Sequence, residues 1–134
     1  MSLVDKLLQL DAAKIKMPEK EIEMKRLSEL LGERVVFRIR AIDGERYADI
    51  QRLAIDISNK GNVKDIDMYK LQVLTIIEGV VDPNLKDKRL LEHFNCTTPE
   101  ELVKKLMLAG EITDLYNEIT KLSGYEVEVE DIKN

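Results

Sequence analysis

Hydrophobic positions in the second half of the chain recur at intervals of three and four residues, which is typical of amphipathic helices. Two such stretches lie between residues 98 and 124, separated by Ala109-Gly110. The first begins at Thr98-Pro99-Glu100-Glu101, a capping box in which the threonine hydroxyl accepts from the amide of Glu101, whose carboxylate reaches back. Gly124 can give the second helix a left-handed C-terminal cap. The sequence therefore predicts two helices here.

Another helix is predicted from the cap signal Asp43-Gly44 to about Ser58, and a polar loop follows at residues 59–62. A short helical piece at residues 90–94 connects the two halves of the bundle, and it ends at the polar break Asn95-Cys96-Thr97.

The helix expected from Asp65 or Asp67 to Val81 is apolar around most of its circumference, which predicts a central position in the bundle. The break at Asp82-Pro83 ends it, because proline lacks the amide that a helix interior needs. Its hydrophobic residues are interpreted first as core. The alternative is an adaptable apolar groove for a partner helix, since methionine and leucine side chains repack easily. That groove would consist of Met68, Leu71 and Leu74.

The period changes to two in the first half of the chain, where hydrophobic and polar residues alternate as in a strand with one buried face. The alternating positions are Ile22, Met24, Val35, Phe37, Ile39 and Ala41. With Gly32 as the turn, they predict an antiparallel hairpin over residues 20–42. The spacing of Leu27, Leu30 and Leu31 fits a helical turn equally well. Because a lone hairpin has open edges, it must lie on the helices or pair with another chain.

Residues 2–10 form a short amphipathic pattern, in which Ser2 and Asp5 resemble a helix start signal. A helix this short is marginal in water, so it must dock on its own domain or on a neighbouring subunit or client. The linker at residues 11–19, which contains Pro18, permits both. The candidate residues for self-association or partner binding in this segment are Leu3, Leu7, Leu8 and Leu10.

Together these elements predict a mainly α (α+β) protein with four to six short helices packed as an irregular bundle and one N-terminal β-hairpin. A chain of 134 residues fits one domain. We expect an N-terminal helix and linker arm at 1–19, a single globular domain at 20–125 (hairpin 20–42, helices 44–124), and an acidic tail at 126–134. The tail alternates acidic residues with valine, so it either adds an edge strand or stays disordered, and its acidity indicates that it is solvated.

Composition argues against several classes of function. The net charge is −5, so a general phosphate-binding surface is not expected, and Arg34, Arg38 and Arg40 are interpreted as the solvated face of a strand. No apolar run approaches the roughly 20 residues of a membrane span, and the N-terminus lacks the features of a signal peptide. The single cysteine, Cys96, cannot form an internal disulfide, which fits a reducing cytoplasm.

Catalytic and metal-binding patterns are not found in the sequence. The single histidine, His93, has no cysteine or histidine neighbours at zinc-ligand spacing, and glycine-rich phosphate loops are missing. We interpret His93 as structural and Cys96 as a bystander in a polar connector. The sequence predicts no enzyme, catalytic residue, metal or cofactor.

Four segments, taken in order, resemble the tail assembly chaperones of the XkdN-like type from phages and defective prophages of Gram-positive bacteria. The segments are Val81-Asp82-Pro83-Asn84-Leu85, Thr98 to Lys105, Leu108-Ala109-Gly110-Glu111-Ile112 and Leu122-Ser123-Gly124-Tyr125. Phe37 to Ile42 agrees as well. The order and spacing match along most of the chain, so the set is moderately specific although no single segment is.

The resemblance implies a non-enzymatic chaperone that binds the long, hydrophobic tape measure protein and keeps it soluble before the tail tube forms. It also implies a homo-oligomer in the host bacterial cytoplasm, absent from the finished virion. In many relatives a longer frameshifted form recruits the tail tube protein. The alternative function is a small regulatory or adaptor protein that masks a single folded partner. Neither nucleic acid nor membrane is an expected partner.

Overall fold

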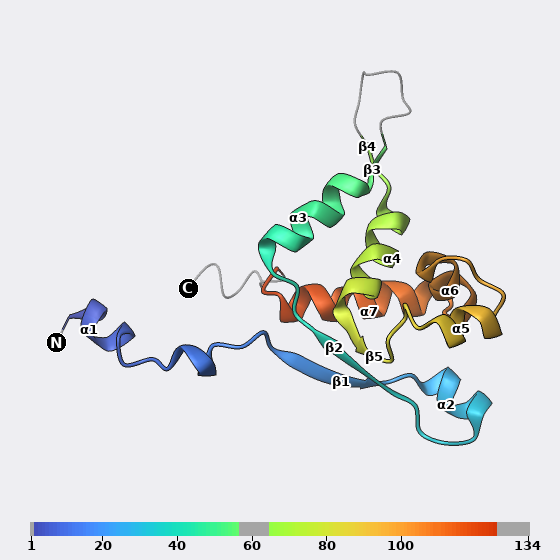
Figure 1. Cartoon of the computed structure of the whole chain (residues 1–134), viewed down its shortest axis with the longest axis horizontal. Helices are drawn as coiled ribbons and strands as arrows, with labels where there is room; N and C mark the ends of the chain where they lie inside the picture. Colours follow the sequence, from blue (N-terminus) through green and yellow to red (C-terminus); the bar gives the residue numbers. More distant parts are fainter. Residues whose placement is uncertain (1, 57–64, 126–134) are drawn as a thin grey trace.

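The structure is a computed structural model that describes residues 2–56 and 65–125 (Figure 1). Its elements alternate between short helices and shorter strands. In chain order they are α1 (Leu3–Leu7), the 3-10 helix η1 (Ala12–Lys14), β1 (Glu19–Glu23), α2 (Lys25–Leu31), β2 (Val36–Arg40), α3 (Gly44–Leu53), β3 (Ile55–Asp56), β4 (Asp65–Ile66), α4 (Met68–Gly79), β5 (Val80–Asp82), α5 (Lys88–His93), α6 (Pro99–Leu106) and α7 (Ala109–Leu122).

The predicted α+β class is confirmed, and so is the antiparallel pairing of the N-terminal strands. β1 pairs with β2 in a register that runs from Glu19 opposite Arg40 to Glu23 opposite Val36. The connection differs from a tight turn, because α2 occupies it and makes the described α-helices seven. Ser28 holds this connection together: its Oγ accepts from the amide of Val35 at 2.8 Å and donates to the carbonyl of Met24 at 3.0 Å.

A third strand, β5, corrects the prediction for the helix that precedes Asp82-Pro83. That helix ends at Gly79 rather than Val81, and Val80–Asp82 pairs with the open edge of β2. The sheet order is β1-β2-β5. The reason is tertiary: two β-branched valines beside an unpaired strand edge gain ladder hydrogen bonds that one more helical turn would not supply.

α3 is shorter than predicted, ending at Leu53 instead of about Ser58, because Ile55–Asp56 pairs with Asp65–Ile66. Its start is as predicted: Asp43 Oδ1 accepts from the amide of Arg46 at 2.8 Å. Of the two candidate caps for α4, Asp67 is used, accepting from the amide of Lys70 at 3.0 Å. The expected loop at 59–62 and the acidic tail lie outside the described residues.

The start of α6 confirms its cap and adds a detail. Thr98 Oγ1 accepts from the amide of Glu101 at 3.2 Å, with Pro99 in the first turn. The Glu101 carboxylate reaches back one residue further than expected, to the amide of Thr97 at 3.1 Å and its hydroxyl at 2.8 Å. Those hydrogen bonds hold the pKa of Glu101 below its usual value. Gly124, after α7, has the expected positive φ of 86°.

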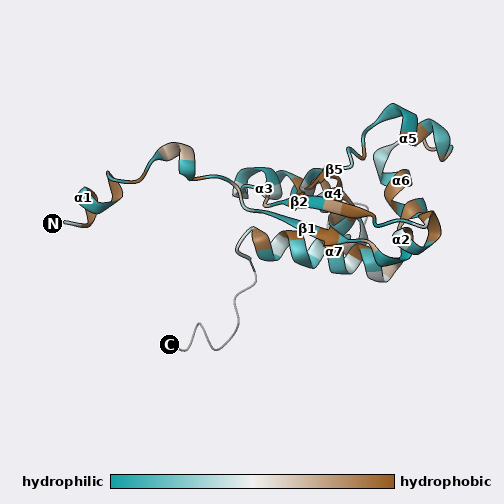
Figure 2. Ribbon diagram, turned by 90° about the horizontal axis from the view of Figure 1, so that it is seen from below, coloured by the Kyte–Doolittle hydropathy of each residue, from teal (hydrophilic) through white to brown (hydrophobic). Residues whose placement is uncertain are grey.

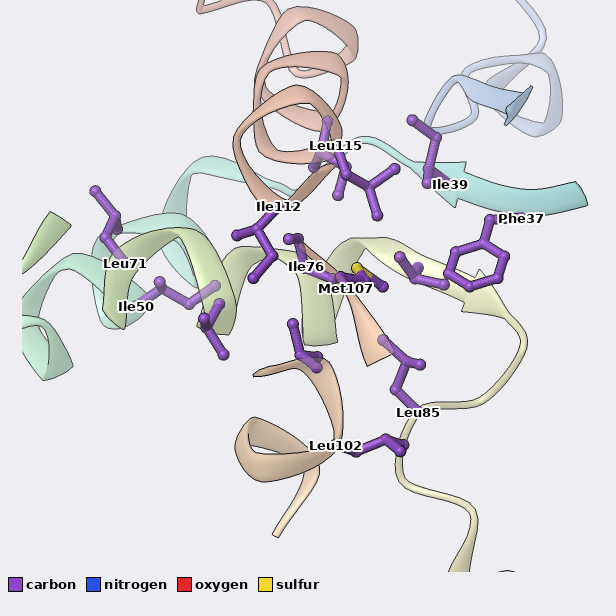
Figure 3. Close-up of a cluster of buried hydrophobic side chains, with 14 of the residues drawn as sticks. Phe37, Ile39, Ile50, Leu71, Ile76, Leu85, Leu102, Met107, Ile112 and Leu115 are labelled. Atoms are coloured by element: carbon purple, nitrogen blue, oxygen red, sulfur yellow. The ribbon is translucent and has the colours of Figure 1, made fainter. Parts of the chain in front are cut away.

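The core lies around α4, which contacts α3, α6 and α7 as its all-round hydrophobicity predicted (Figures 1 and 3). In the close-up, side chains from α4, α6, α7 and β2 converge on one region. Ile76, Leu102 and Ile119 are wholly buried there. Cys96 also belongs to this core, which corrects its interpretation as a bystander: Asn95 and Thr97 on either side are exposed, while the thiol points inward.

The three arginines near β2 lie on the solvated face of the sheet, as the alternation predicted. Arg34, Arg38 and Arg40 are exposed, and Glu21 and Glu19 of β1 stand opposite Arg38 and Arg40. Arg38 lies 3.6 Å from Glu19 and Arg34 lies 3.6 Å from Glu23. Exposed pairs of this kind contribute little to stability, and here they neutralise a local positive charge.

Candidate functional site

The N-terminal arm, residues 2–18, extends away from the rest of the described chain (Figures 1 and 2). None of its residues is buried. Four of the predicted contact residues are in it, with exposed fractions between 55% and 76%: Leu3, Leu7, Leu8 and Leu10. Val4, Ile15 and Met17 add to this apolar surface. Monomeric soluble proteins rarely leave so many large apolar side chains uncovered in one segment.

A capping box begins α1 as the sequence predicted. The amide of Asp5 donates to Ser2 Oγ at 3.1 Å, and the amide of Ser2 donates to the Asp5 carboxylate at 3.1 Å. The Ser2 hydroxyl also donates to this carboxylate, at 2.8 Å. The hydrogen bonds from the hydroxyl and the amide of Ser2 lower the pKa of Asp5. A five-residue helix remains marginal without a surface to pack on. The arm therefore has a defined helical start and an apolar stripe that the described part of its chain does not cover.

A second uncovered apolar surface lies where α3 ends and α4 begins. We call it the α3–α4 end patch, and it comprises Leu53, Ile66 and Met68, whose exposed fractions are 57%, 46% and 53%. The amide of Asp67 donates to the carbonyl of Ala54 at 2.8 Å, which holds the two chain segments together. Met68 is one of the predicted partner residues, whereas no sequence pattern indicated that Leu53 and Ile66 are uncovered.

The other two residues of the predicted partner groove lie elsewhere. Leu71 is 4% exposed in the core, and Leu74 is partly buried against it. Only Met68 of that set is open to a partner, because the side of α4 that carries Leu71 and Leu74 packs on neighbouring helices. The three residues therefore do not share one open surface.

An open groove of about 740 Å³ lies between β1 and α7, and no local sequence pattern indicates it. We call it the β1–α7 groove. Ile22, Met24 and Leu115 contribute apolar lining, while Glu111, Asp114 and Glu118 contribute acidic lining along α7. Lys20, on the same strand, donates to Glu118 at 2.8 Å. The groove joins segments almost a hundred residues apart, which is why local spacing cannot reveal it.

Arg26 of α2 forms one end of this groove. Its guanidinium donates to both oxygens of the Glu111 carboxylate, with a shortest distance of 2.8 Å, and to the carbonyl of Leu106 at 2.7 Å. The pKa of Glu111 is lowered, first by the hydrogen bonds from Arg26, against an opposing effect of burial. Three chain segments are therefore joined by one side chain.

Replacing Arg26 with leucine is expected to lower the free energy of unfolding by about 1–2 kcal/mol at neutral pH, since a half-exposed bidentate pair and a carbonyl bond are lost. Because the folded pKa of Glu111 lies below its unfolded value near 4.5, the pair stabilises the fold above that pH. The difference in the free energy of unfolding between the wild type and Arg26→Leu should shrink as the pH falls below this value. Urea unfolding followed by circular dichroism measures both quantities.

Arg34→Leu is the matched control, because Arg34 is also paired with a glutamate but its side chain is 73% exposed. Its effect should stay within about 0.5 kcal/mol. Equal losses in the two variants would show that Arg26 has no special role in joining α2 to α7.

The described residues offer little chemistry beyond these surfaces. Within residues 2–56 and 65–125, no three Asp, Glu, His or Cys side chains are arranged to hold a metal ion. His93 is exposed, with its ring edge against Phe94 at 4.8 Å between centroids. The Tyr47 hydroxyl lies 2.6 Å from that of Tyr116, and burial raises its pKa, so it stays protonated and joins α3 to α7.

None of the described helices has the length and hydrophobicity that crossing a bilayer requires.

Comparison with known proteins matches the chain to one family over nearly its whole length. The profile of the phage XkdN-like tail assembly chaperone proteins matches residues 4–134. The phage-like element PBSX protein XkdN of Bacillus subtilis (strain 168) is 26% identical over 128 residues, which cover 92% of this chain and 84% of that protein. The uncharacterized protein YqbN of the same strain is 27% identical over 113 residues, covering 81% of this chain and 76% of YqbN.

The fold is also shared with a solved structure. The crystal structure of the protein yqbn matches with a TM-score of 0.62 at 22% identity, covering 83% of this chain and 90% of that chain. At this identity the likeness concerns the fold alone. The sequence match from residue 4 to the last residue decides the family, and this chain belongs to the phage XkdN-like tail assembly chaperones.

Proposed function

We propose that this tail assembly chaperone binds the tape measure protein and keeps it soluble until the tail tube forms around it. The observation that carries the proposal is the large amount of apolar side chain left uncovered on an acidic protein, in the N-terminal arm and the α3–α4 end patch. A long hydrophobic client supplies matching apolar surface. The family is one of assembly chaperones and not of enzymes.

In this proposal the α3–α4 end patch contacts the client directly. Leucine, isoleucine and methionine side chains adapt to many helical surfaces, and methionine does so most easily. Such a small patch gives a weak contact by itself. Weak contacts suit a chaperone that the growing tube must displace.

Many copies bound along one client give high avidity from weak individual contacts, because each bound copy raises the effective concentration of the next. The proposal therefore includes a homo-oligomer that acts in the host bacterial cytoplasm and is left out of the virion. The tail tube protein, reached through a longer frameshifted form, is the second partner of this scheme.

The test is co-expression with the tape measure protein encoded in the same tail gene cluster. Changing Leu53 and Met68 to glutamate should move most of the client from the soluble to the pelleted fraction. Each apolar side chain removed from a contact costs about 1.5–3 kcal/mol, and 1.4 kcal/mol is tenfold in affinity. Quantitative blotting of both fractions measures the effect.

Leu30→Glu/Leu31→Glu is the matched control, because those leucines of α2 are at least as exposed as the patch residues and are not part of the patch. It should leave the client soluble. The mass of the isolated complex separates this proposal from the masking of a single folded partner, which requires a fixed one-to-one or two-to-two complex. A client that pellets equally with and without the chaperone would refute the proposal.

A further inference from the structure

We propose that the N-terminal arm of one copy lies in the β1–α7 groove of a second copy, so that self-association is built from an arm and a groove. Both halves of this contact are present in the one chain. The arm presents Leu3, Leu7 and Leu10 at helical spacing, with exposed fractions of 55–70%. The groove has an open volume of about 740 Å³ and offers Ile22 and Leu108, of which Leu108 is 58% exposed. Its lining also includes Met24 and Leu115, which are 6% and 2% exposed.

The arm of each copy extends away from the groove of the same copy. Its last residue is fixed to the sheet, because the amide of Ala41 donates to the carbonyl of Pro18 at 2.9 Å. From there the arm runs away from α2 in both views, whereas the groove is lined by the far end of β1 and the start of α2 (Figures 1 and 2). A second copy can bring its arm to the groove without reversing the chain at Pro18.

Charge complementarity between the two surfaces is confined to the acidic row of α7. Lysines outnumber aspartates in the arm, three to two, and Asp5 is already occupied by the capping box with Ser2. Three acidic residues of α7 line the groove, and so do Glu23 and the basic side chains of Lys25, Arg26 and Lys121. Arg26 and Lys20 pair with Glu111 and Glu118, while Asp114 stands exposed between those two. Lys14 and Lys16, which follow α1, are the arm residues suited to that acidic side.

The strand edge beside the groove disfavours another way of associating. β1 is an edge of the sheet, but its sequence Glu-Lys-Glu-Ile-Glu is highly charged. Charged edge strands oppose pairing with a further strand. Side-chain docking of a helix into the groove therefore fits this surface better than strand addition.

The experiment measures molar mass by light scattering after gel filtration, with the full chain and without any client. The wild-type protein should be larger than a monomer, with a mass that rises with concentration. Leu7→Asp/Leu8→Asp removes the arm contact, and Asp114→Arg/Asn117→Arg fills the groove with long cationic side chains. Each pair should weaken association at least tenfold.

Matched controls separate these effects from charge alone. Leu30→Asp/Leu31→Asp makes the same change as the arm variant at two leucines of α2 that do not line the groove. Gln51→Arg/Glu92→Arg makes the same charge change as the groove variant on α3 and α5. Both controls should keep the wild-type mass. Circular dichroism should confirm that all four variants fold, because every substituted position is at least partly exposed.

Mixing the two defective variants gives the sharpest result. The intact arm of the groove variant can enter the intact groove of the arm variant, so the mixture should form a one-to-one dimer that grows no further. A wild-type monomer, an unchanged mass in either variant, or a mixture that stays monomeric would overturn the proposal. The assay contains no tape measure protein, so its failure would leave the proposed client binding standing.

Discussion

Changing Ile76 to alanine is expected to lower the free energy of unfolding by about 2–5 kcal/mol. Ile76 has no exposed surface and lies in α4, the helix that α3, α6 and α7 contact. Removing its outer carbons leaves a cavity that four packed elements cannot collapse into without disturbing one another. Since a protein of this kind is stable by only about 5–15 kcal/mol, the variant should lose a large share of its stability. Urea unfolding measures the change.

Two controls use the same kind of truncation elsewhere. Ile77→Ala, at the next residue of α4, removes a partly exposed side chain and should cost less. Leu7→Ala lies in the arm, where the side chain is 55% exposed, and at a dilution where the copies are separate it should change stability by no more than about 0.5 kcal/mol. A large loss of stability for Leu7→Ala under those conditions would mean that the arm packs on its own chain. That result would also contradict the proposed docking of the arm in the β1–α7 groove of a second copy.

Gly79→Ala is expected to destabilise the protein by about 1–3 kcal/mol, although alanine is the better helix former. A Cβ at Gly79 would lie 2.7 Å from Cδ1 and 2.8 Å from Cγ2 of Ile119. Ile119 is completely buried in α7, so it has no free space to move into. Glycine is therefore required here by the close approach of α4 to α7 and not by its backbone angles. The measurement is again urea unfolding.

Gly110→Ala is the matched control in α7, because an added Cβ there meets nothing within 4 Å. It should stabilise the protein by about 0.4–1 kcal/mol. A double-mutant cycle with Ile119→Ala isolates the clash: once Ile119 is truncated, Gly79→Ala should lose most of its cost. If Gly79→Ala costs the same in both backgrounds, contact with Ile119 is not the reason for the glycine.

The two apolar surfaces give separate predictions for assembly. Arm variants should weaken both self-association and client holding, because fewer linked copies mean less avidity. Variants of the α3–α4 end patch should weaken client holding alone. Comparing the two sets in the same co-expression assay tests whether association and client binding are distinct properties of the chain.

The sequence by itself determined the elements whose signals are local. Cap residues at Ser2, Asp43, Asp67 and Thr98 marked helix starts, and alternation in β1 and β2 marked the paired strands. Such signals suffice because a cap or an amphipathic stripe needs only neighbours within a few residues. The order of short motifs from Phe37 to Tyr125 also indicated the family, which the match over residues 4–134 confirms.

The tertiary structure decided what depends on residues far apart in the chain. Val80–Asp82 became a strand because β2 offers an edge, and Cys96 became a core residue because helices enclose it. Leu71 and Met68 lie one turn apart on α4, yet only Met68 is exposed. The β1–α7 groove likewise exists only once residues about 90 apart lie together. Burial is a property of packing among distant segments, so periodicity can mark a stripe as apolar but cannot tell what covers it.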